Sequence, residues 1–126
     1  MSLPRRPQVA GWLQNLDDMT RGEVDEALDY LQEHGHAAAL PDVRHRIQIS
    51  RHFPAMSEVR VDIDEAHLYR VLVGFGPNDV PALLLAGNKA GIGNHWYDEN
   101  VPIADDRFDA YLAALARPRT MTKEPS

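Results

Sequence analysis

The chain has 126 residues, a net charge of −6 at neutral pH, 44% hydrophobic residues and no cysteine. This length fits a single domain with a modest core, and the lack of cysteine excludes disulfides, thiolate chemistry and cysteine-ligated zinc. The acidic balance disfavours binding to nucleic acid through overall charge, and no apolar run approaches the ~20 residues that a membrane span requires. We therefore expect a cytoplasmic protein that does not associate with a membrane.

Two helices are predicted at the N-terminus. The first is indicated by apolar residues that recur at helical spacing, namely Val9, Trp12, Leu13 and Leu16. Thr20 and Glu23 form a capping-box pattern at the start of the second helix, and Met19 and Val24 are placed to pack together as a hydrophobic staple. Gly35 is expected to end this helix. The short connection between the two helices favours an antiparallel hairpin.

The centre of the chain predicts an antiparallel meander. Alternating apolar residues predict a strand over residues 43–49, although its other positions are polar or basic, and a second strand over residues 57–63. Two apolar runs of strand length, residues 68–75 and 80–87, flank a Gly-Pro-Asn-Asp turn. Between residues 44 and 60, four arginines and two histidines accompany one carboxylate. A local basic surface and an ordinary solvated loop are equally open interpretations of this stretch.

A third helix is predicted near the C-terminus. Asp105 and Asp106 are placed at its start, where carboxylates favour the positive end of the helix dipole, and Pro118 ends it. We expect one domain over residues 1–117 and a flexible tail over residues 118–126. The order of two helices, three or four strands and a helix predicts an α+β fold, with a small antiparallel sheet and helices on one face.

The stretch AGNKAGIGNHWYDENVP, residues 86–102, is the most unusual part of the sequence. Its lysine precedes Gly91 instead of following it, which excludes a P-loop, and no third glycine completes a dinucleotide-binding fingerprint. The six histidines of the chain show no zinc-binding spacing, so we expect neither a metal nor a cofactor. The stretch is predicted to be the end of the last strand and a loop that leads into the final helix.

Five residues of the second half form a candidate catalytic site: Arg60, Arg70, Lys89, His95 and Tyr97. Neighbouring strands lie about 4.8 Å apart, so the three cations can converge on one face or rim of the sheet. Cations stabilise a pentacovalent phosphate, and histidine and tyrosine transfer protons. Trp96 or Tyr97 can stack on a base. These are the parts of a metal-free ribonuclease, in which the ribose 2′-OH attacks the adjacent phosphorus.

The same residues have an ordinary structural interpretation, which composition alone favours. Arg60 can pair with Glu58 or Asp62, Trp96 can anchor the loop to the core, and His95 can be an exposed surface residue. If the site is catalytic, Arg70 on a central strand is expected to point toward a solvent-open cleft, because an unpaired buried charge is too costly.

The C-terminal half resembles the RelE/ParE superfamily of type II toxins and, more narrowly, an actinobacterial HigB/RelE-like branch. The resemblance covers residues 50–112 and depends on the segments SEVR, YRVLVGFGP and PALLLAGNKAGIGNHWYDENVPIADDRFDAYL. The last segment is the specific part, since its lysine, its Trp-Tyr pair and its PIAD helix start fall in register with the family pattern. The N-terminal helical hairpin matches more loosely.

The resemblance implies a cytoplasmic toxin that is neutralised by a cognate antitoxin, expected to be a helix-turn-helix protein. Many RelE- and HigB-like members enter the ribosomal A site and cut mRNA, whereas ParE-like members inhibit DNA gyrase. The functional cations of the family fall on Arg60, Arg70 and Lys89, with Tyr97 as a further candidate.

The sequence also departs from the family pattern. Ser57 stands in place of a usual lysine and Asn88 in place of a usual aspartate, and Asn94 and His95 replace basic residues, which weakens phosphate binding. Three hypotheses therefore stay open: a ribosome-dependent endoribonuclease, a catalytically degenerate or ParE-like protein that acts by binding a partner such as gyrase, and an interaction domain with no toxic role.

The N-terminal segment MSLPRRPQ offers no convincing counterpart to the first strand of the family. Without that strand, one edge of the sheet is expected to be unpaired, and exposed edges invite pairing with another chain. We therefore expect an antitoxin segment, or a second copy in a homodimer, to cover it.

Overall fold

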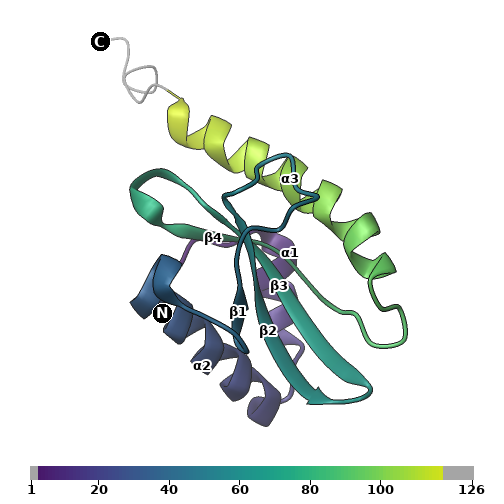
Figure 1. The fold of residues 1–126 in the computed structure, drawn as a ribbon. Coiled ribbons are helices and arrows are strands. Elements are labelled where there is room, and N and C mark those ends of the chain that lie inside the picture. The colour runs from purple at the N-terminus through teal and green to yellow at the C-terminus, as the bar shows by residue number, and fades with distance from the viewer. Residues whose placement is uncertain (1–2, 118–126) are drawn as a thin grey trace.

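The computed structural model describes residues 3–117 and contains three α-helices and four strands (Figure 1). In chain order these are α1 (Pro7–Gln14), α2 (Asp18–His34), β1 (Val43–Arg44), β2 (Met56–Asp64), β3 (His67–Phe75), β4 (Pro81–Asn88) and α3 (His95–Ala116), with short 3₁₀ helices η1 (Gly35–Ala37) and η2 (Pro77–Asp79). The strands form one antiparallel sheet in the order β1-β2-β3-β4. This confirms the predicted α+β class. The predicted tail, with Pro118, lies outside the described residues.

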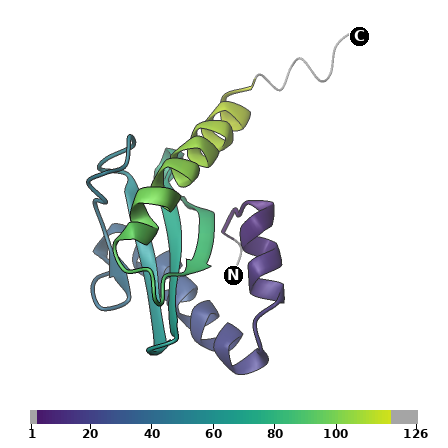
Figure 2. The same ribbon diagram turned by 90° about the vertical axis from the view of Figure 1, so that its right-hand side faces the viewer.

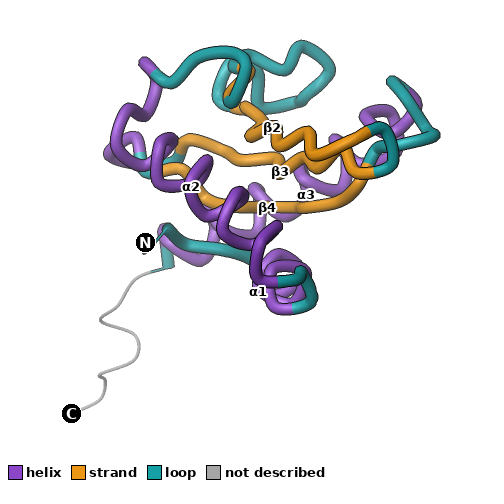
Figure 3. Tube along the Cα trace, turned by 90° about the horizontal axis from the view of Figure 1, so that it is seen from below, coloured by secondary structure: helices purple, strands orange, loops and turns teal. Residues whose placement is uncertain are grey.

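The helices cover both faces of the sheet, whereas the sequence predicted helices on one face. Successive strand residues point to opposite faces, and two hydrophobic clusters result. Val71 and Val73 of β3 belong to the cluster that contains the apolar faces of α1 and α2, while Leu72 between them packs in the cluster beneath α3. Figure 2 shows α1 and α3 on opposite sides of the strands, and Figure 3 shows α1 and α2 along one side. Within residues 3–117, no helix combines the length and apolarity needed to cross a bilayer.

The start of α2 differs from the predicted capping box. Asp17 is the N-cap, and its side chain accepts a hydrogen bond of 2.7 Å from the backbone N–H of Thr20. Thr20 therefore lies inside the helix, and its backbone N–H is the donor that the Asp17 side chain caps. Met19 is 81% exposed, so the predicted staple with Val24 does not form. The helix ends at Gly35, as predicted, and the positive φ of 53° at this residue favours glycine.

The strand predicted over residues 43–49 ends after Arg44. Arg46 has a φ of 61°, which takes the backbone out of the extended conformation, and the chain rejoins the sheet only where the N–H of Ile47 donates to the carbonyl of Met56 at 2.9 Å. Residues 45–55 form a long loop that lies across α3 (Figure 1). The alternation of Val43, Ile47 and Ile49 therefore did not indicate a continuous ladder.

The last helix begins at His95, ten residues before the predicted start. Pro102 lies inside it, although proline removes one helical hydrogen bond. The buried residues Trp96, Val101, Ala104 and Phe108 extend the apolar face of α3 toward its N-terminus. Their packing against the sheet outweighs the proline, and the Trp-Tyr pair therefore lies on a helix instead of in a loop.

The sequence predicted one unpaired edge of the sheet, and in the structure the edge of β4 is covered by the chain itself. The N–H of Arg6 donates to the carbonyl of Leu83 at 2.9 Å, and the N–H of Leu83 donates to the carbonyl of Pro4 at 2.8 Å. Further along the edge, the side-chain amide of Gln8 donates to the carbonyl of Ala86 at 2.9 Å and accepts from its N–H at 3.0 Å. The physical reason for expecting a partner at this edge is therefore wrong.

Candidate functional site

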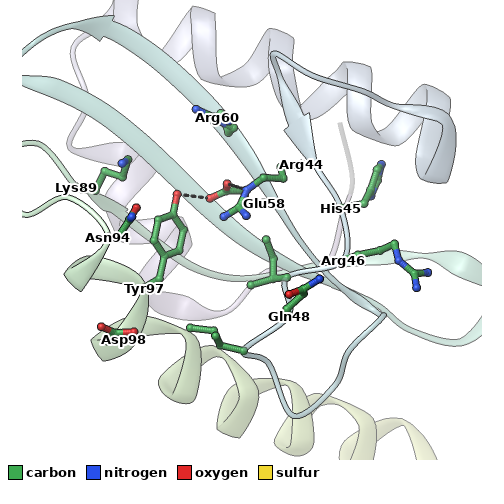
Figure 4. A pocket seen from close by; sticks show the side chains of 12 residues that line it. Arg44, His45, Arg46, Gln48, Glu58, Arg60, Lys89, Asn94, Tyr97 and Asp98 are labelled. Carbon is green, nitrogen blue, oxygen red and sulfur yellow. Dashed lines mark hydrogen bonds and ion pairs between the residues drawn. The ribbon is translucent and has the colours of Figure 1, made fainter.

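A pocket of about 510 Å³ lies between the β1–β2 loop, one face of β2 and the N-terminal turn of α3 (Figure 4). Four cationic side chains from three separate parts of the sequence line it: Arg44 and Arg46, Arg60, and Lys89. Glu58 and Asp98 are the carboxylates of the lining, and Tyr97 is its aromatic residue. The basic stretch around residues 44–60 therefore supplies a local basic surface.

The strand register brings these charges together. Glu58 and Arg60 are two residues apart on β2, so they point to the same face of the sheet. Arg44 of β1 is the Cα partner of Glu58, and Arg70 of β3 is the Cα partner of Arg60. Opposite charges that face each other across strands attract, whereas the Arg60–Arg70 pair is repulsive unless carboxylates intervene.

Glu58 is the buried centre of the site, with 0% of its side chain exposed. Arg44 Nε donates to Glu58 Oε2 at 2.6 Å, and the hydroxyl of Tyr97 donates to Glu58 Oε1 at 2.8 Å (Figure 4). The Tyr97 hydroxyl in turn accepts from Arg70 Nε at 3.3 Å. Burial raises the pKa of Tyr97, and the negative charge of Glu58 raises it further. Tyr97 therefore keeps its proton at neutral pH.

Arg70 lies behind this network and does not face a cleft. Its side chain is only 2% exposed, which corrects the expectation that it points toward solvent. Arg70 Nη1 donates to Asp62 Oδ1 at 2.6 Å and to the carbonyl of Tyr69 at 2.8 Å, and its Nε is 3.8 Å from Glu58 Oε1. The buried charge is tolerated because it is paired.

Arg46, Arg60 and Lys89 are the lining cations that the network leaves available. None of them forms an ion pair among residues 3–117, and the buried Nε of Arg60 has no hydrogen-bond partner there. Arg44 and Arg70 occupy the carboxylates that were expected to pair with Arg60. Lys89 Nζ lies 5.7 Å from the centroid of the Tyr97 ring, and the guanidinium carbon of Arg44 lies 5.2 Å from it.

His95 and Trp96 lie apart from the pocket. His95 is in the first turn of α3, where its side chain is 77% exposed and its Nδ1 is 3.4 Å from Asp98 Oδ2. Trp96 is 4% exposed and packs in the core beneath α3, so it cannot stack on a base. The structure thus places Arg60, Lys89 and Tyr97 on one pocket, Arg70 directly behind Tyr97, and His95 outside its lining.

The sequence interpretation did not single out Arg44, Glu58 or Asp98 as site residues. The alternation of Glu58 with Arg60 gave them a common face, but the pairing of Arg44 with Glu58 requires the strand register. Asp98 was missed because residues 95–98 were taken as a loop. Within residues 3–117, no three His, Cys, Asp or Glu side chains gather as ligands for a metal ion.

Residues 11–109 match the family described as "Phage derived protein Gp49-like (DUF891)". The chain is also 37% identical over 106 residues to the Mycobacterium tuberculosis (strain ATCC 25618 / H37Rv) protein named "Putative toxin HigB2", and 36% identical over 108 residues to "Putative toxin HigB3" of the same strain. These alignments cover 84% and 86% of the chain, and 52% and 90% of the two relatives, so the chain spans about half the length of the first. No solved structure matches the chain.

The α+β fold with a cationic pocket is therefore that of a Gp49-like protein, and the chain belongs to this family. The similarity to the two HigB proteins confirms the resemblance to HigB-like toxins that the C-terminal motifs indicated.

Proposed function

We propose that this protein is the toxin of a type II toxin–antitoxin system and that it cleaves mRNA on the ribosome. Two relatives that carry the name of toxins, and match most of the chain, support the toxin assignment. A cytoplasmic location and a cognate antitoxin, expected to be a helix-turn-helix protein, belong to the same proposal.

The observation that carries the ribonuclease proposal is that Arg60 and Lys89, two of the three lining cations with no ion pair among residues 3–117, lie on the pocket that contains Tyr97. Cations in a partly enclosed pocket bind a phosphodiester and stabilise the charge that develops on its non-bridging oxygens. Arg44 and Arg70 are already neutralised by Glu58 and Asp62. Their role is to hold Glu58 and Tyr97 in place.

The proposed reaction is an attack of the ribose 2′-oxygen on the adjacent phosphorus. The bond between the 2′-oxygen and phosphorus forms while the bond to the 5′-oxygen breaks, which leaves a 2′,3′-cyclic phosphate and a 5′-hydroxyl. Tyr97 carries its proton at neutral pH, as a tyrosine with an unshifted pKa also does. In the proposed reaction its hydroxyl exchanges the hydrogen bond to Glu58 for one to the departing 5′-oxygen, and donates the proton there. His95 is the candidate that accepts the 2′-OH proton from RNA extending over the rim of the pocket.

A translation extract tests the proposal directly. The parent protein should cut mRNA on translating ribosomes, and Arg60→Ala or Lys89→Ala should lower the cleavage rate by roughly 10²–10³-fold. Arg117→Ala, which removes an exposed arginine after the end of α3, should cleave at the parent rate. If the parent leaves mRNA intact, the ribonuclease proposal fails. If His95→Ala keeps full activity, His95 is not the base.

The second candidate function is inhibition through protein contact, with gyrase as one example. The observation that favours it is the buried Glu58, which already satisfies Arg44 and reduces the charge available to RNA. This function predicts growth arrest on induction without RNA cleavage. An interaction domain with no toxic role predicts neither effect, so a growth assay together with RNA analysis separates all three functions.

A further inference from the structure

The β1–β2 loop, residues 45–55, builds one wall of the cationic pocket. Five consecutive residues of this loop line the pocket: His45, Arg46, Ile47, Gln48 and Ile49. The loop is tied to the sheet near its two ends and at Ile47: His45 Nδ1 is 2.8 Å from the hydroxyl of Ser57, the N–H of Ile47 donates to the carbonyl of Met56, and the carbonyl of Ala55 accepts from the N–H of Phe75. A loop of this length has few intrinsic constraints, so the position of the wall depends on what holds the loop further along.

The loop is held to α3 by a buried carboxylate. Asp105 is 2% exposed, and both of its oxygens accept hydrogen bonds from the loop. Oδ1 accepts from the hydroxyl of Ser50 at 2.6 Å, and Oδ2 accepts from the backbone N–H of Arg51 at 3.0 Å. The hydroxyl oxygen of Ser50 also accepts from the N–H of His52 at 2.9 Å. Hydrogen bonds to a charged, buried acceptor are among the strong ones in proteins.

More exposed polar contacts between the loop and α3 surround the hydrogen bonds of Asp105. The guanidinium of Arg51 contacts Asp109, and also Asp106 at 3.3 Å, while His52 Nε2 is 2.7 Å from Asp109 Oδ1. Exposed ion pairs contribute little. Apolar contacts also hold the loop, since Ile47 is buried in the core beneath α3 and the ring of His52 lies 4.7 Å from that of Phe108. Among the polar contacts between the loop and α3, the constraint is concentrated at Asp105.

Two contacts transmit this constraint to the pocket wall. The N–H of Ser50 donates to the carbonyl of Ile47 at 3.2 Å, which ties the anchored residue to the buried wall residue. The guanidinium carbon of Arg46 lies 4.9 Å from the centroid of the Phe53 ring, on the returning limb of the loop. Gln48 and Ile49 lie between these fixed points.

We propose that Asp105 is a positioning residue for the pocket: it holds the β1–β2 loop against α3 and thereby places the wall that Arg46, Gln48 and Ile49 form. The claim that this wall contacts a substrate rests on the proposed ribonuclease function. The claim that Asp105 keeps the wall ordered does not depend on that function. The sequence placed Asp105 at the start of a helix, but the structure shows it in the middle of α3, bonded to a segment 55 residues away along the chain.

The test compares Asp105→Asn with Asp106→Asn in the full chain. Asparagine keeps the size of aspartate but presents an amide N–H₂ to one of two donors that require an acceptor. Asp106 is a matched control because it is the next residue, undergoes the same loss of charge and contacts only the exposed Arg51 at 3.3 Å. Hydrogen exchange of the backbone amides at residues 46–49 is the direct readout of wall order.

Asp105→Asn should accelerate exchange at residues 46–49 by about tenfold or more, with exchange in β3 unchanged. Asp106→Asn should leave exchange at residues 46–49 and in β3 at the parent rates. In the translation extract, Asp105→Asn should raise the protein concentration required for half-maximal mRNA cleavage by about tenfold, because it disorders a binding wall, while the maximal rate stays close to that of the parent. Ser50→Ala, which removes the hydroxyl donor from the loop side, should give the same pattern if Asp105→Asn does not fold.

Unchanged exchange at residues 46–49 in both Asp105→Asn and Ser50→Ala would overturn the inference, whatever the activity of the parent. Faster exchange with an unchanged concentration dependence would also overturn it, since a disordered wall would then not matter to the pocket. If the parent does not cleave mRNA but the exchange result is as expected, the ribonuclease proposal fails and the positioning of the wall by Asp105 stands.

Discussion

At the scale of single residues, the structure separates two arginines that the sequence placed together in the candidate catalytic site. The sequence also left open an ordinary pairing of Arg60 with Glu58 or Asp62, and it expected Arg70 to face the cleft. Instead Arg70 pairs with Asp62 and approaches Glu58 behind Tyr97, while Arg60 lines the pocket without an ion pair among residues 3–117. The strand sequence alone cannot decide which arginine pairs, because both arginines lie on the same face and both carboxylates are within reach of either.

The buried position of Arg70 predicts a loss of stability on its removal, where a cleft residue would leave the fold intact. Arg70→Ala leaves the fully buried Glu58 with only Arg44 and Tyr97, and removing one partner of a buried charge pair typically costs about 3–5 kcal/mol. Urea unfolding should therefore show a large decrease in the free energy of unfolding. Arg60→Ala, which breaks no ion pair, is the control. Equal stabilities of the two variants would contradict the assignment of Arg70 as a structural cation.

Tyr97 predicts a specific dependence of stability on pH. Its pKa is raised above the ordinary value of 10.0 in the folded state, by burial first and by the charge of Glu58 second. The folded state then binds the phenolic proton more tightly than the unfolded state does. The resulting stabilisation is fully present below pH 10 and is lost as the pH rises through the folded-state pKa.

The comparison with Tyr97→Phe isolates this contribution. The free energy of unfolding of the parent should fall more steeply above pH 10 than that of Tyr97→Phe, because phenylalanine has no proton to lose. Tyr69, whose pKa is also raised by burial, remains in both proteins and cancels in the difference. Parallel stability curves for the two proteins between pH 9 and 11 would show that Tyr97 does not titrate as proposed.

At the scale of elements, the sequence predicted which helices and strands exist better than it predicted the residues at which they begin and end. Both N-terminal helices, the four strands and the last helix follow from the apolar patterns of the sequence, since these patterns persist wherever the exact ends fall. The boundaries of β1 and α3 were wrong because tertiary contacts decide them. Asp105 holds the β1–β2 loop away from the sheet, and Trp96 extends α3 past Pro102.

Two glycines of the sheet show a packing requirement that periodicity does not indicate. A Cβ at Gly74 would lie 2.8 Å from the ring of Phe108, and one at Gly87 would lie 3.2 Å from the ring of Trp96. These glycines let α3 approach β3 and β4 closely, which brings Tyr97 to the pocket. Of the candidate site, Lys89 and Tyr97 were found through the motif. Their common pocket depends on this approach and on the strand register.

The N-cap of α2 gives a prediction at the same scale. Asp17→Ala removes the acceptor for the N–H of Thr20 and should lower the free energy of unfolding measured in urea. Asp18→Ala, one residue further, removes only the exposed contact with Arg21 and should cost less. The hydrogen bond from the Thr20 backbone lowers the pKa of Asp17. Its contribution is therefore present above pH 3.8 and is lost as the pH falls through the folded-state pKa.

At the scale of the whole molecule, the net charge of −6 conceals an uneven distribution. The pocket collects four cations against two carboxylates, while acidic residues dominate the exposed surface of α2. The sum over the chain therefore indicates little about which ligand one pocket prefers, because charges more than about 8 Å away are largely screened at physiological salt. A phosphate site on an acidic protein requires only this local excess.

The covered edge of β4 sets the expectation for the oligomeric state. A strand edge with free N–H and C=O groups is a template for pairing with another chain. Here the segment before α1 occupies Leu83, and the Gln8 amide occupies both groups of Ala86. The Gln8 side chain acts as a short substitute for a strand, so the edge gives no reason for a homodimer.

Replacing Gln8 tests whether its side-chain amide protects the edge of β4. Gln8→Leu keeps a side chain of similar size but leaves the N–H and C=O of the buried Ala86 without partners, which typically costs about 1–3 kcal/mol. We expect lower stability in urea and an average mass in light scattering that increases with protein concentration. Gln14→Leu, at the exposed end of α1, adds the same apolar group without opening the edge and should stay at the parent mass. If Gln8→Leu matches Gln14→Leu in both measurements, the Gln8 amide does not protect the edge, and the N-terminal segment alone must do so.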